Sequence, residues 1–477
     1  MWLFLMGLNL KDSYAEKDAF EPLDLSTPSG TTGAALSQRG VYYRGSRIGF
    51  IRERLSPLEQ GYRAEQTGEL TLNVLGRERQ MRIEGSVTTL ASGALAEFDF
   101  RLRTSSGRSP FETVIRGVVN GDALELNIRS ARSERSEVRE LDEPIVLPLN
   151  LYYSLAGHGW TSGETYQVRL FDPMTLAEGD ATVAVKDAEI VRWGSREEEA
   201  FRLQTTFAGL TTTAWVSETG EVLKEETPLG WTLIKEAPGS GLEVRGDRPP
   251  NDVAILSAVP AIGFSGDASS LNFAELRLVD FPGGFDELDG GRQHAEGDTV
   301  TITIDVSAYA DASILSPDAR RDALAADAFA QSDDVAIIEQ ATRIAEGLSA
   351  EDTARALNDW VFSHVSKSPT LSLPSAVEVL EQRVGDCNEH TVLFVALARA
   401  SGLPTRIATG LAYTGGQFYY HAWPEVWIDA WVPVDPTFGQ FPADPLHVRL
   451  LTGGLETQYE ILKLLGRGAT IEVLRTE

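Results

Sequence analysis

Cysteine is almost absent from this chain, because Cys387 is the single thiol among 477 residues. One cysteine can form neither an internal disulfide nor a cysteine-rich zinc site, so both kinds of scaffold are excluded. The count says nothing about the redox compartment. Any thiol chemistry in this protein depends on Cys387.

Positive charge is also scarce. The chain has 42 Lys and Arg residues against 70 Asp and Glu residues, which gives a formal net charge of −28 at pH 7. A surface of this sign repels phosphate backbones and anionic lipids, so nucleic acid is not an expected partner. Phosphate-binding loops, dinucleotide fingerprints and EF-hand loops are missing, which predicts no cofactor. His158, His294, His364 and His447 show no mutual ligand spacing, so no metal site is predicted.

Long apolar runs are missing too. The run from Trp2 to Leu8 is too short to cross a bilayer, and no later segment has enough consecutive apolar residues. We therefore expect no stable membrane span. Because the run has no basic flank, it is either the remnant of a signal or anchor or a misassigned start. We expect an exported protein, periplasmic or secreted.

The pattern of residues divides the chain into four segments. Residues 1–38 are rich in Ser, Thr, Gly, Pro and charge, which is typical of a mobile leader or linker. Residues 39–240 alternate apolar and polar side chains and are predicted to form a large antiparallel β domain. Residues 241–315 carry a further patch of strand pattern and are expected to form a small connecting subdomain. Residues 316–477 are predicted to form an α+β catalytic domain.

The β-rich segment contains at least eight strand-like runs and recognisable turn signals. Asn120-Gly121 and Thr219-Gly220 each separate two such runs, as in β-hairpins. This predicts an antiparallel sandwich or a strongly curved half-barrel sheet. The mixed-sign run at 129–143 is interpreted as a solvated loop or edge and is given no function.

Helical periodicity appears after Pro317. Residues 333–349 have one apolar face, and a second amphipathic helix is predicted from the N-cap Ser349 onward. A short helix follows over 375–386, and another apolar helix begins at Cys387. After that helix, the remaining runs are typical of strands.

Cys387 follows Gly385-Asp386 and is expected in the first turn of its helix. Free backbone N–H groups and the helix dipole favour a thiolate there, so we expect a lowered pKa for this thiol. Taken alone, however, Cys387 fits the role of a small buried hydrophobe better than that of a nucleophile.

A thiol nucleophile needs a base, and the base needs an orienting partner. His421 lies within the strand pattern "FYYHAWPEVWI", and Asp435 ends the next pattern, "WVPVD". Only Asp429-Ala430 separates the two patterns, so a hairpin is predicted that returns Asp435 close to His421. Cys387, His421 and Asp435 are therefore predicted as nucleophile, base and orienter.

Two stretches of this sequence match a known family. "GDCNEHTVLFVALARASGLPTRIATGLAY" and "YYHAWPEVWIDAWVPVDPTFGQ" resemble the transglutaminase-like superfamily, with its papain-like core and its Cys, His, Asp triad in this chain order. The resemblance covers roughly residues 330–450. By motif position, it implies that Cys387 is the nucleophile, His421 the general base and acid, and Asp435 the orienter.

Other residues near these motifs receive separate interpretations. Pro424 cannot donate to a β ladder, so its strand is expected to be an edge or bulged there. The backbone N–H of Cys387 is expected to stabilise the oxyanion together with a donor that we do not assign. Trp360 is a possible second donor but is interpreted as a packing residue. His390 is expected to pack or cap rather than act as the base.

The predicted site performs acyl transfer through a thioester. We expect hydrolysis of a peptide or protein substrate, which makes the protein a transglutaminase-like peptidase or amidase. A protein-crosslinking transglutaminase that uses an amine acceptor is the alternative. A non-catalytic binding or assembly protein built on the β-rich domain is the alternative from another class.

Overall fold

In the computed structural model of this protein, the chain forms two compact units. The first contains residues 1–130 and 134–252, and the second contains residues 131–133 and 253–477. The described residues are 34–74, 77–106, 109–130, 133–207, 210–228, 230–237, 239–240, 258–281, 288–305, 315–368, 375–453 and 468–477. Most of the segment predicted as a leader, residues 1–33, lies outside these ranges. The first strand begins at Ala35, which pairs with Leu55. The strand therefore starts inside the segment 1–38 that was predicted to be a leader or linker.

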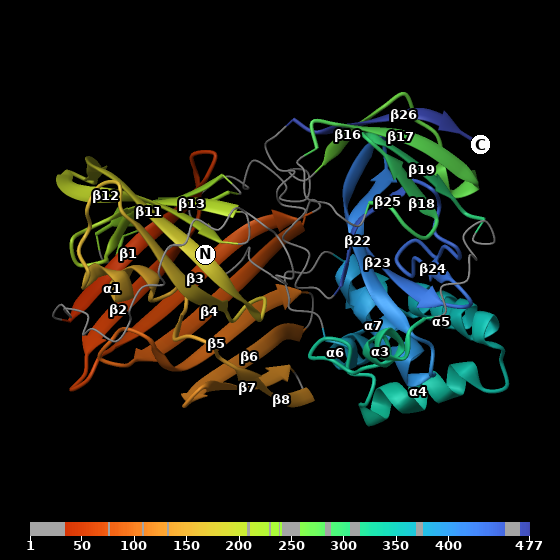
Figure 1. The fold of residues 1–477 in the computed structure, drawn as a ribbon, viewed down its shortest axis with the longest axis horizontal. Helices are drawn as coiled ribbons and strands as arrows, with labels where there is room; N and C mark the ends of the chain where they lie inside the picture. Colours follow the sequence, from red (N-terminus) through yellow and green to blue (C-terminus); the bar gives the residue numbers. More distant parts are fainter. Residues whose placement is uncertain are drawn as a thin grey trace. The chain divides into compact units, whose positions relative to one another are not determined.

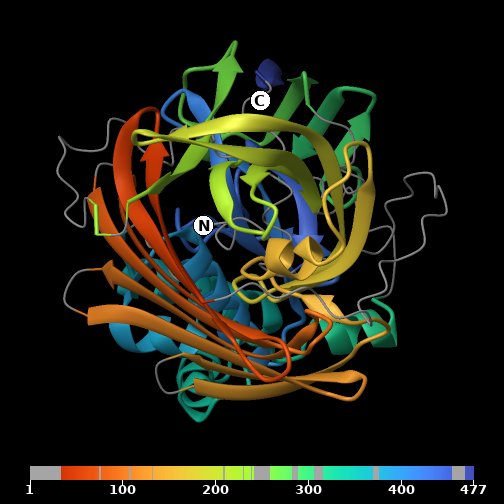
Figure 2. The same ribbon diagram turned by 90° about the vertical axis from the view of Figure 1, so that its left-hand side faces the viewer.

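The first unit is one curled sheet of fifteen strands (Figures 1 and 2). Its strands are β1 (Ala35–Tyr43), β2 (Ser46–Pro57), β3 (Tyr62–Val74), β4 (Arg77–Thr89), β5 (Leu95–Ser106), β6 (Ser109–Asn120), β7 (Ala123–Ser130), β8 (Ser133–Glu140), β9 (Ile145–Val146), β10 (Thr165–Asp172), β11 (Ala177–Trp193), β12 (Arg196–Phe207), β13 (Leu210–Val216), β14 (Val222–Glu226) and β15 (Trp231–Glu236). The spatial order is β8 to β1 followed by β15 to β9. Neighbouring strands are therefore also sequential except at the β1–β15 junction, and the sequential strands β8 and β9 lie at the two ends of this order. β9 and β10 pair in parallel. The large antiparallel β domain expected from the sequence is confirmed.

Turn chemistry explains the hairpins of this sheet. Gly121 and Gly220 have φ values of +62° and +86°, which favour glycine, and each lies in a predicted hairpin connection. Alternating burial along the strands places apolar side chains on the inner face; β7, for example, shows it over its whole length. Helix α1 (Leu151–Ala156) lies within the curve of the sheet (Figure 2).

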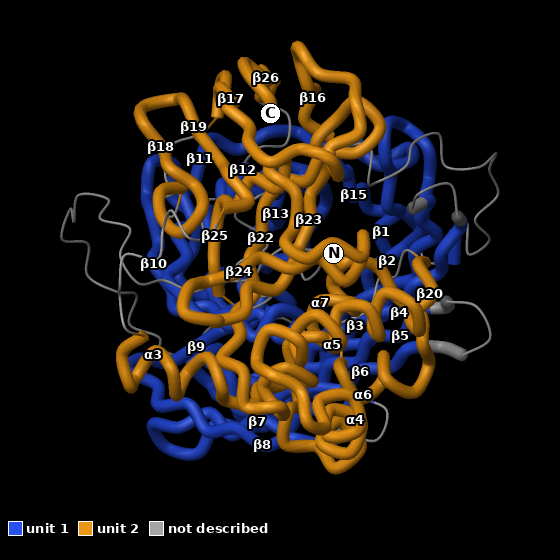
Figure 3. Tube along the Cα trace, turned by 90° about the vertical axis from the view of Figure 1, so that its right-hand side faces the viewer, with its two compact units in different colours: residues 1–130, 134–252 blue, residues 131–133, 253–477 orange. Residues whose placement is uncertain are grey.

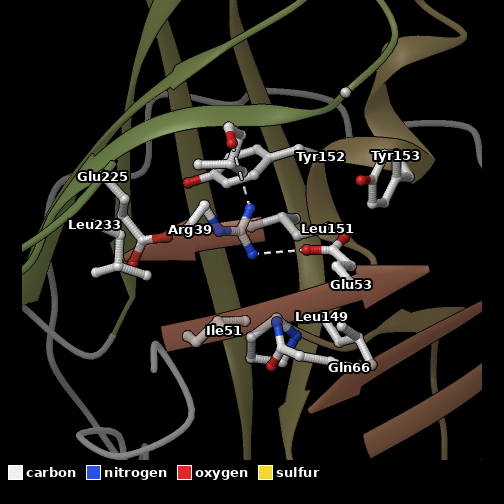
Figure 4. A pocket seen from close by; sticks show the side chains of 13 residues that line it. Arg39, Ile51, Glu53, Gln66, Leu149, Leu151, Tyr152, Tyr153, Glu225 and Leu233 are labelled. Carbon is white, nitrogen blue, oxygen red and sulfur yellow. Dashed lines mark hydrogen bonds and ion pairs between the residues drawn. The ribbon is translucent and has the colours of Figure 1, made fainter. Parts of the chain in front are cut away.

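A charged cluster is buried on this inner face (Figure 4). Arg39 Nη2 lies 2.6 Å from Glu53 Oε2, and each side chain is 5% exposed. Burial opposes the charge of Arg39, but Glu53 and then Glu225 outweigh burial and raise the pKa of the guanidinium. Burial also raises the pKa of Glu225. The sheet therefore encloses a buried ion pair. Removal of either partner would leave an uncompensated charge inside the sheet and destabilise the folded protein.

The second unit carries a mixed sheet in the order β18-β19-β17-β26-β16-β23-β22-β25, with β24 paired to β23 (Figure 3). Its strands are β16 (Val259–Ile262), β17 (Phe273–Val279), β18 (Gln293–Glu296), β19 (Thr299–Thr303), β22 (Thr405–Thr414), β23 (Gln417–Trp427), β24 (Trp431–Pro433), β25 (His447–Gly453) and β26 (Thr470–Thr476). β20 (Ser366–Lys367) and β21 (Val384–Gly385) form a separate parallel pair. The strands from the segment predicted as a connecting subdomain thus join the same sheet as β22 and β23. The predicted boundaries of that segment stay a prediction.

Five helices gather at one end of this sheet (Figures 1 and 3). They are α3 (Pro317–Asp322), α4 (Val335–Ala345), α5 (Ala350–His364), α6 (Ala376–Gln382) and α7 (Cys387–Ala400). Ser349 caps α5 by accepting a hydrogen bond from the Asp352 N–H, as predicted. α7 is the central helix, because every residue from Val392 to Ala398 is fully buried in the core shared with the other helices and β23.

In the part of the chain that the structure describes, no helix has both the length and the apolar character needed to cross a membrane.

Removing one charge from the buried pair in the first unit should destabilise it. Glu53→Gln leaves the Arg39 charge buried with a weaker partner, so we expect the free energy of unfolding to fall by about 3 kcal/mol in a urea titration. The matched control is Glu65→Gln. Its pair with Arg63 spans 3.7 Å with both side chains 45% exposed, so a change within about 0.5 kcal/mol is expected. Equal stability of the two variants would contradict this.

Candidate active site

Cys387 opens α7 behind a complete N-terminal cap. Asp386 Oδ1 accepts a hydrogen bond from the Asn388 N–H at 3.0 Å, and Glu389 Oε2 accepts one from the Asp386 N–H at 2.9 Å. This capping box fixes the first turn of the helix. Gly385 is required beside it, because a Cβ atom there would lie 2.1 Å from the Cβ of Glu389. The Gly-Asp-Cys sequence therefore encodes the helix start.

Hydrogen bonds join the N-terminal part of α7 to the segment of β23 that carries His421. The Tyr420 hydroxyl donates to Asn388 Oδ1 at 3.0 Å, and Thr391 Oγ1 donates to the carbonyl of Ala422 at 3.0 Å. His421 lies between these two β23 contacts, at the middle of the segment 420–422. The start of α7, where Cys387 lies, therefore packs against the segment 420–422.

The expected lowering of the Cys387 pKa is wrong for this structure. Burial raises the pKa of the thiol well above its usual value, and the Asp386 carboxylate adds to this effect. The Ala422 N–H acts in the opposite direction but is outweighed. The helix N-terminus alone does not decide the ionisation, because the cap that completes it is itself negatively charged. Removal of the thiol proton therefore depends on a nearby base.

His421 and Asp435 form the predicted pair. β24 pairs with β23 through Trp427 and Trp431, and this hairpin returns Asp435 so that its Oδ2 lies 2.8 Å from His421 Nε2. Asp435 is fully buried and accepts, at Oδ1, the backbone N–H groups of Thr437 at 2.7 Å and Phe438 at 2.9 Å.

The geometry assigns the tautomer of His421. An ionised carboxylate only accepts, so Nε2 carries the hydrogen, and in the neutral ring the lone pair is on Nδ1. Burial opposes ionisation of Asp435, but His421 and then His447 outweigh burial and hold the pKa of this carboxyl well below its usual range. The ring of Phe438 stacks on the His421 ring, with centroids 4.8 Å apart. The Asp435 carboxylate thus holds one edge of the His421 ring, and the Phe438 ring packs on one of its faces.

His447 is the main residue that the sequence interpretation missed. Its Nε2 lies 2.9 Å from Asp435 Oδ2, and its Nδ1 lies 3.1 Å from Asp444 Oδ1. Burial disfavours the charged ring, yet Asp444 and then Asp435 outweigh burial and raise the pKa of His447 to about 9. The only local signal was Asp444, three residues earlier. Metal-ligand spacing among the histidines does not reveal such a carboxylate partner.

A metal could use the same group of side chains. One ligand atom each from His421, Asp435 and His447 lies within 4.8 Å of the others, although no metal site was predicted. Both histidine Nε2 atoms, however, contact the single Oδ2 of Asp435 at 2.8 and 2.9 Å. These are hydrogen-bond distances, and hydrogen bonds to a carboxylate require a hydrogen on each nitrogen. The donor set therefore fits a proton-bridged cluster better than a cation site.

The remaining predicted residues occupy the following places. His390 is buried, and its ring nitrogens face the carbonyls of Asp386 at 2.6 Å and Val365 at 3.3 Å, so it packs and caps as expected. Trp360 packs against the helical core and stacks on His364 with centroids 4.6 Å apart. On one side of β23, Pro424 pairs with Ile407 of β22. On the other side, the pairing with β24 begins only at the next residue, Glu425, and continues to Trp427.

The structure therefore places Cys387 at the start of a buried helix that contacts the strand carrying His421, and it bonds His421 to the Asp435 carboxylate. Residues 338–436, which include all three predicted catalytic residues, match the family model of the transglutaminase-like superfamily. This region of the chain is therefore transglutaminase-like, which indicates a cysteine-dependent activity at the level of the family. No curated protein matches the sequence.

Three solved structures are similar to parts of the chain. A candidate cysteine protease from Cytophaga hutchinsonii shares 16% identity over 43% of this chain and 86% of its own, with a TM-score of 0.28. A beta-barrel-like protein of a domain of unknown function from Brucella abortus shares 12% identity over 42% of this chain and 95% of its own, with a TM-score of 0.32. A candidate protease from Parabacteroides distasonis shares 9% identity over 68% of this chain and 64% of its own, with a TM-score of 0.19.

The raised pKa of His447 predicts how stability depends on pH. A group whose pKa is higher in the folded protein stabilises it fully below the unfolded value of about 6.5, and this contribution is lost as pH rises through about 9. The size of the contribution is on the order of 3 kcal/mol. We therefore expect wild type to be more stable than His447→Gln at pH 6, and the difference to shrink by pH 10. A difference that is constant over this range in denaturant titrations would contradict the assignment.

Proposed function

We propose that the second unit hydrolyses amide bonds of a peptide or protein through a thioester on Cys387. The observation that carries the proposal is the buried His421–Asp435 hydrogen bond of 2.8 Å on the strand segment that contacts the first turn of α7. A histidine held in this tautomer directs a basic nitrogen away from the carboxylate. In the proposed reaction this nitrogen accepts the proton of the Cys387 thiol.

The reaction follows from these positions. His421 Nδ1 accepts the thiol proton as the sulfur of Cys387 bonds to the substrate carbonyl carbon, and the carbonyl oxygen becomes an oxyanion. The Cys387 N–H at the positive end of α7 is the proposed oxyanion donor. The protonated imidazole then gives its proton to the leaving amine, the C–N bond breaks, and a thioester remains.

Water completes the turnover. His421 takes a proton from the water as its oxygen attacks the thioester, and the C–S bond breaks to give a carboxylic acid and the regenerated thiol. The Asp435 carboxylate stabilises the imidazolium that forms in both halves of the reaction. Because the thiol is un-ionised before attack, His421 acts as a general base in the first step.

The acceptor of the acyl group distinguishes hydrolysis, in which it is water, from crosslinking, in which it is an amine. Water is always present, and nothing in the sequence marks a site for a lysine side chain, so we choose hydrolysis over amine transfer. The acidic surface charge favours basic peptides as substrates through long-range attraction. An exported location fits such a substrate and is part of the proposal.

Substitution of the nucleophile tests the reaction class. Cys387→Ala should abolish cleavage of a peptide library, as measured by mass spectrometry, while the thermal unfolding midpoint stays close to that of wild type. Asp435→Asn should lower kcat by about 10²- to 10⁴-fold, because the orienting acceptor of His421 is lost. Retained cleavage in Cys387→Ala would end the proposal.

An added primary amine separates hydrolysis from crosslinking. With a peptide library and an alkylamine, we expect carboxylic acid products to dominate, as measured by mass spectrometry. Amine adducts without any hydrolysed product would replace hydrolysis by amine transfer as the function.

Chelation tests the proton-bridged interpretation of the histidine cluster. Prolonged EDTA treatment should leave both cleavage and the unfolding midpoint of wild type unchanged, because hydrogen bonds account for the contacts between His421, Asp435 and His447. Loss of activity with EDTA that is restored by added Zn²⁺ would show that this group holds a metal.

A further inference from the structure

His447 links the proposed triad to a second carboxylate. Asp435 Oδ2 accepts from His421 Nε2 at 2.8 Å and from His447 Nε2 at 2.9 Å, and His447 Nδ1 lies 3.1 Å from Asp444 Oδ1. Both nitrogens of the His447 ring therefore face oxygens that only accept. Both contacts are hydrogen bonds only when both nitrogens carry hydrogen, that is, when the ring is an imidazolium.

Asp444 is held in place to serve this ring. Its Oδ2 accepts from Gln440 Nε2 at 2.8 Å, and its Oδ1 accepts from the Leu446 N–H at 2.9 Å. These donors keep the pKa of the Asp444 carboxyl low even though burial opposes its ionisation, and the charge of His447 contributes most to that lowering. Arg292 Nη2 donates to the backbone carbonyl of Asp444 at 2.9 Å and supports the same loop.

Aromatic rings and titratable side chains surround His447, and the charged Arg292 lies beyond Asp444, on the backbone carbonyl of that residue. Its strand, β25, pairs with β22, where His447 lies opposite Ala412. Its ring contacts the rings of Trp423, Phe438 and His421, with centroids 5.3, 5.9 and 5.6 Å away. Asp435, Asp444 and His421 are thus the titratable groups that face it, and burial leaves no solvent to screen them.

We propose that the imidazolium of His447, held by Asp444, is a positioning residue that fixes the Asp435 carboxylate against His421 and offsets its charge. The inference deepens the proposed function and rests on it. The hydrogen bond from Nε2 orients Oδ2, and the two backbone N–H groups of Thr437 and Phe438 orient Oδ1. The carboxylate therefore cannot rotate away from His421.

The charge of His447 has an effect that a purely structural residue lacks. The two imidazole rings are 5.6 Å apart, so a positive charge on His447 disfavours an added proton on His421 and favours loss of the proton from Cys387. Both effects make the thiol and imidazole release protons at lower pH. Removing the charge should move the onset of thiol reactivity to higher pH.

Alkylation of Cys387 measures this without a known substrate, because no other thiol exists in the chain. Rates with iodoacetamide are measured from pH 5 to 10 for wild type and His447→Gln. We expect the onset of alkylation in His447→Gln to move to higher pH by about one unit. An unchanged onset, or one that moves to lower pH, would overturn the inference.

Asp289→Asn is the matched control, because Asp289 pairs with His294 at 2.8 Å in an exposed Asp–His pair. It should leave the onset unchanged, and an equal shift in this variant would overturn the inference. If His447→Gln does not fold, the NMR titration of His447 in wild type decides. Titration near pH 9 supports the imidazolium, and titration at or below about 6.5 overturns it.

A further variant separates this inference from the proposed function. If His421→Gln alkylates with the profile of wild type, His421 does not act on Cys387 and the proposed function fails. The NMR titration of His447 still reports whether the imidazolium exists. If His421→Gln changes the profile and His447→Gln does not, only the inference fails.

Discussion

The site depends on one carboxylate. Asp435 is fully buried, and it remains ionised only because two backbone N–H groups and two imidazoles satisfy its oxygens. A buried carboxylate is costly unless it is fully hydrogen-bonded, so the turn after β24, the ring on β23 and the ring on β25 must be assembled together. The hairpin, the sheet register and the cap of α7 all contribute to that one arrangement.

Local patterns predicted the parts of this arrangement that are encoded locally. The cap of α7 and the hairpin that joins His421 to Asp435 each depend on a few neighbouring residues, so the helix start at Cys387 and the His421–Asp435 pair could be predicted from the sequence. His447 could not, because its contact with Asp435 is made when β25 pairs with β22 across the sheet. Neither turn chemistry nor periodicity reports such a pairing.

The Cys387 thiol shows why electrostatics is harder to predict than position. The helix start was correctly located, but the sign of the pKa shift was wrong, because burial and the capping carboxylate outweigh the helix dipole. Similarly, the alternation of residues in the first unit predicted an antiparallel sheet but not the Arg39–Glu53 pair inside it. Both partners lie on the inner face of adjacent strands, where sequence pattern alone predicts apolar residues.

The position of β26 constrains the order of folding in the second unit. β26 lies between β16 and β17, although it is made long after both of them. Until Thr476 has left the ribosome, those two strands present unpaired edges, and edges of this kind attract other chains. A nascent chain that has already exposed Cys387 thus still lacks an interior strand of its sheet, and protection by a chaperone during synthesis would be of greatest value at that stage.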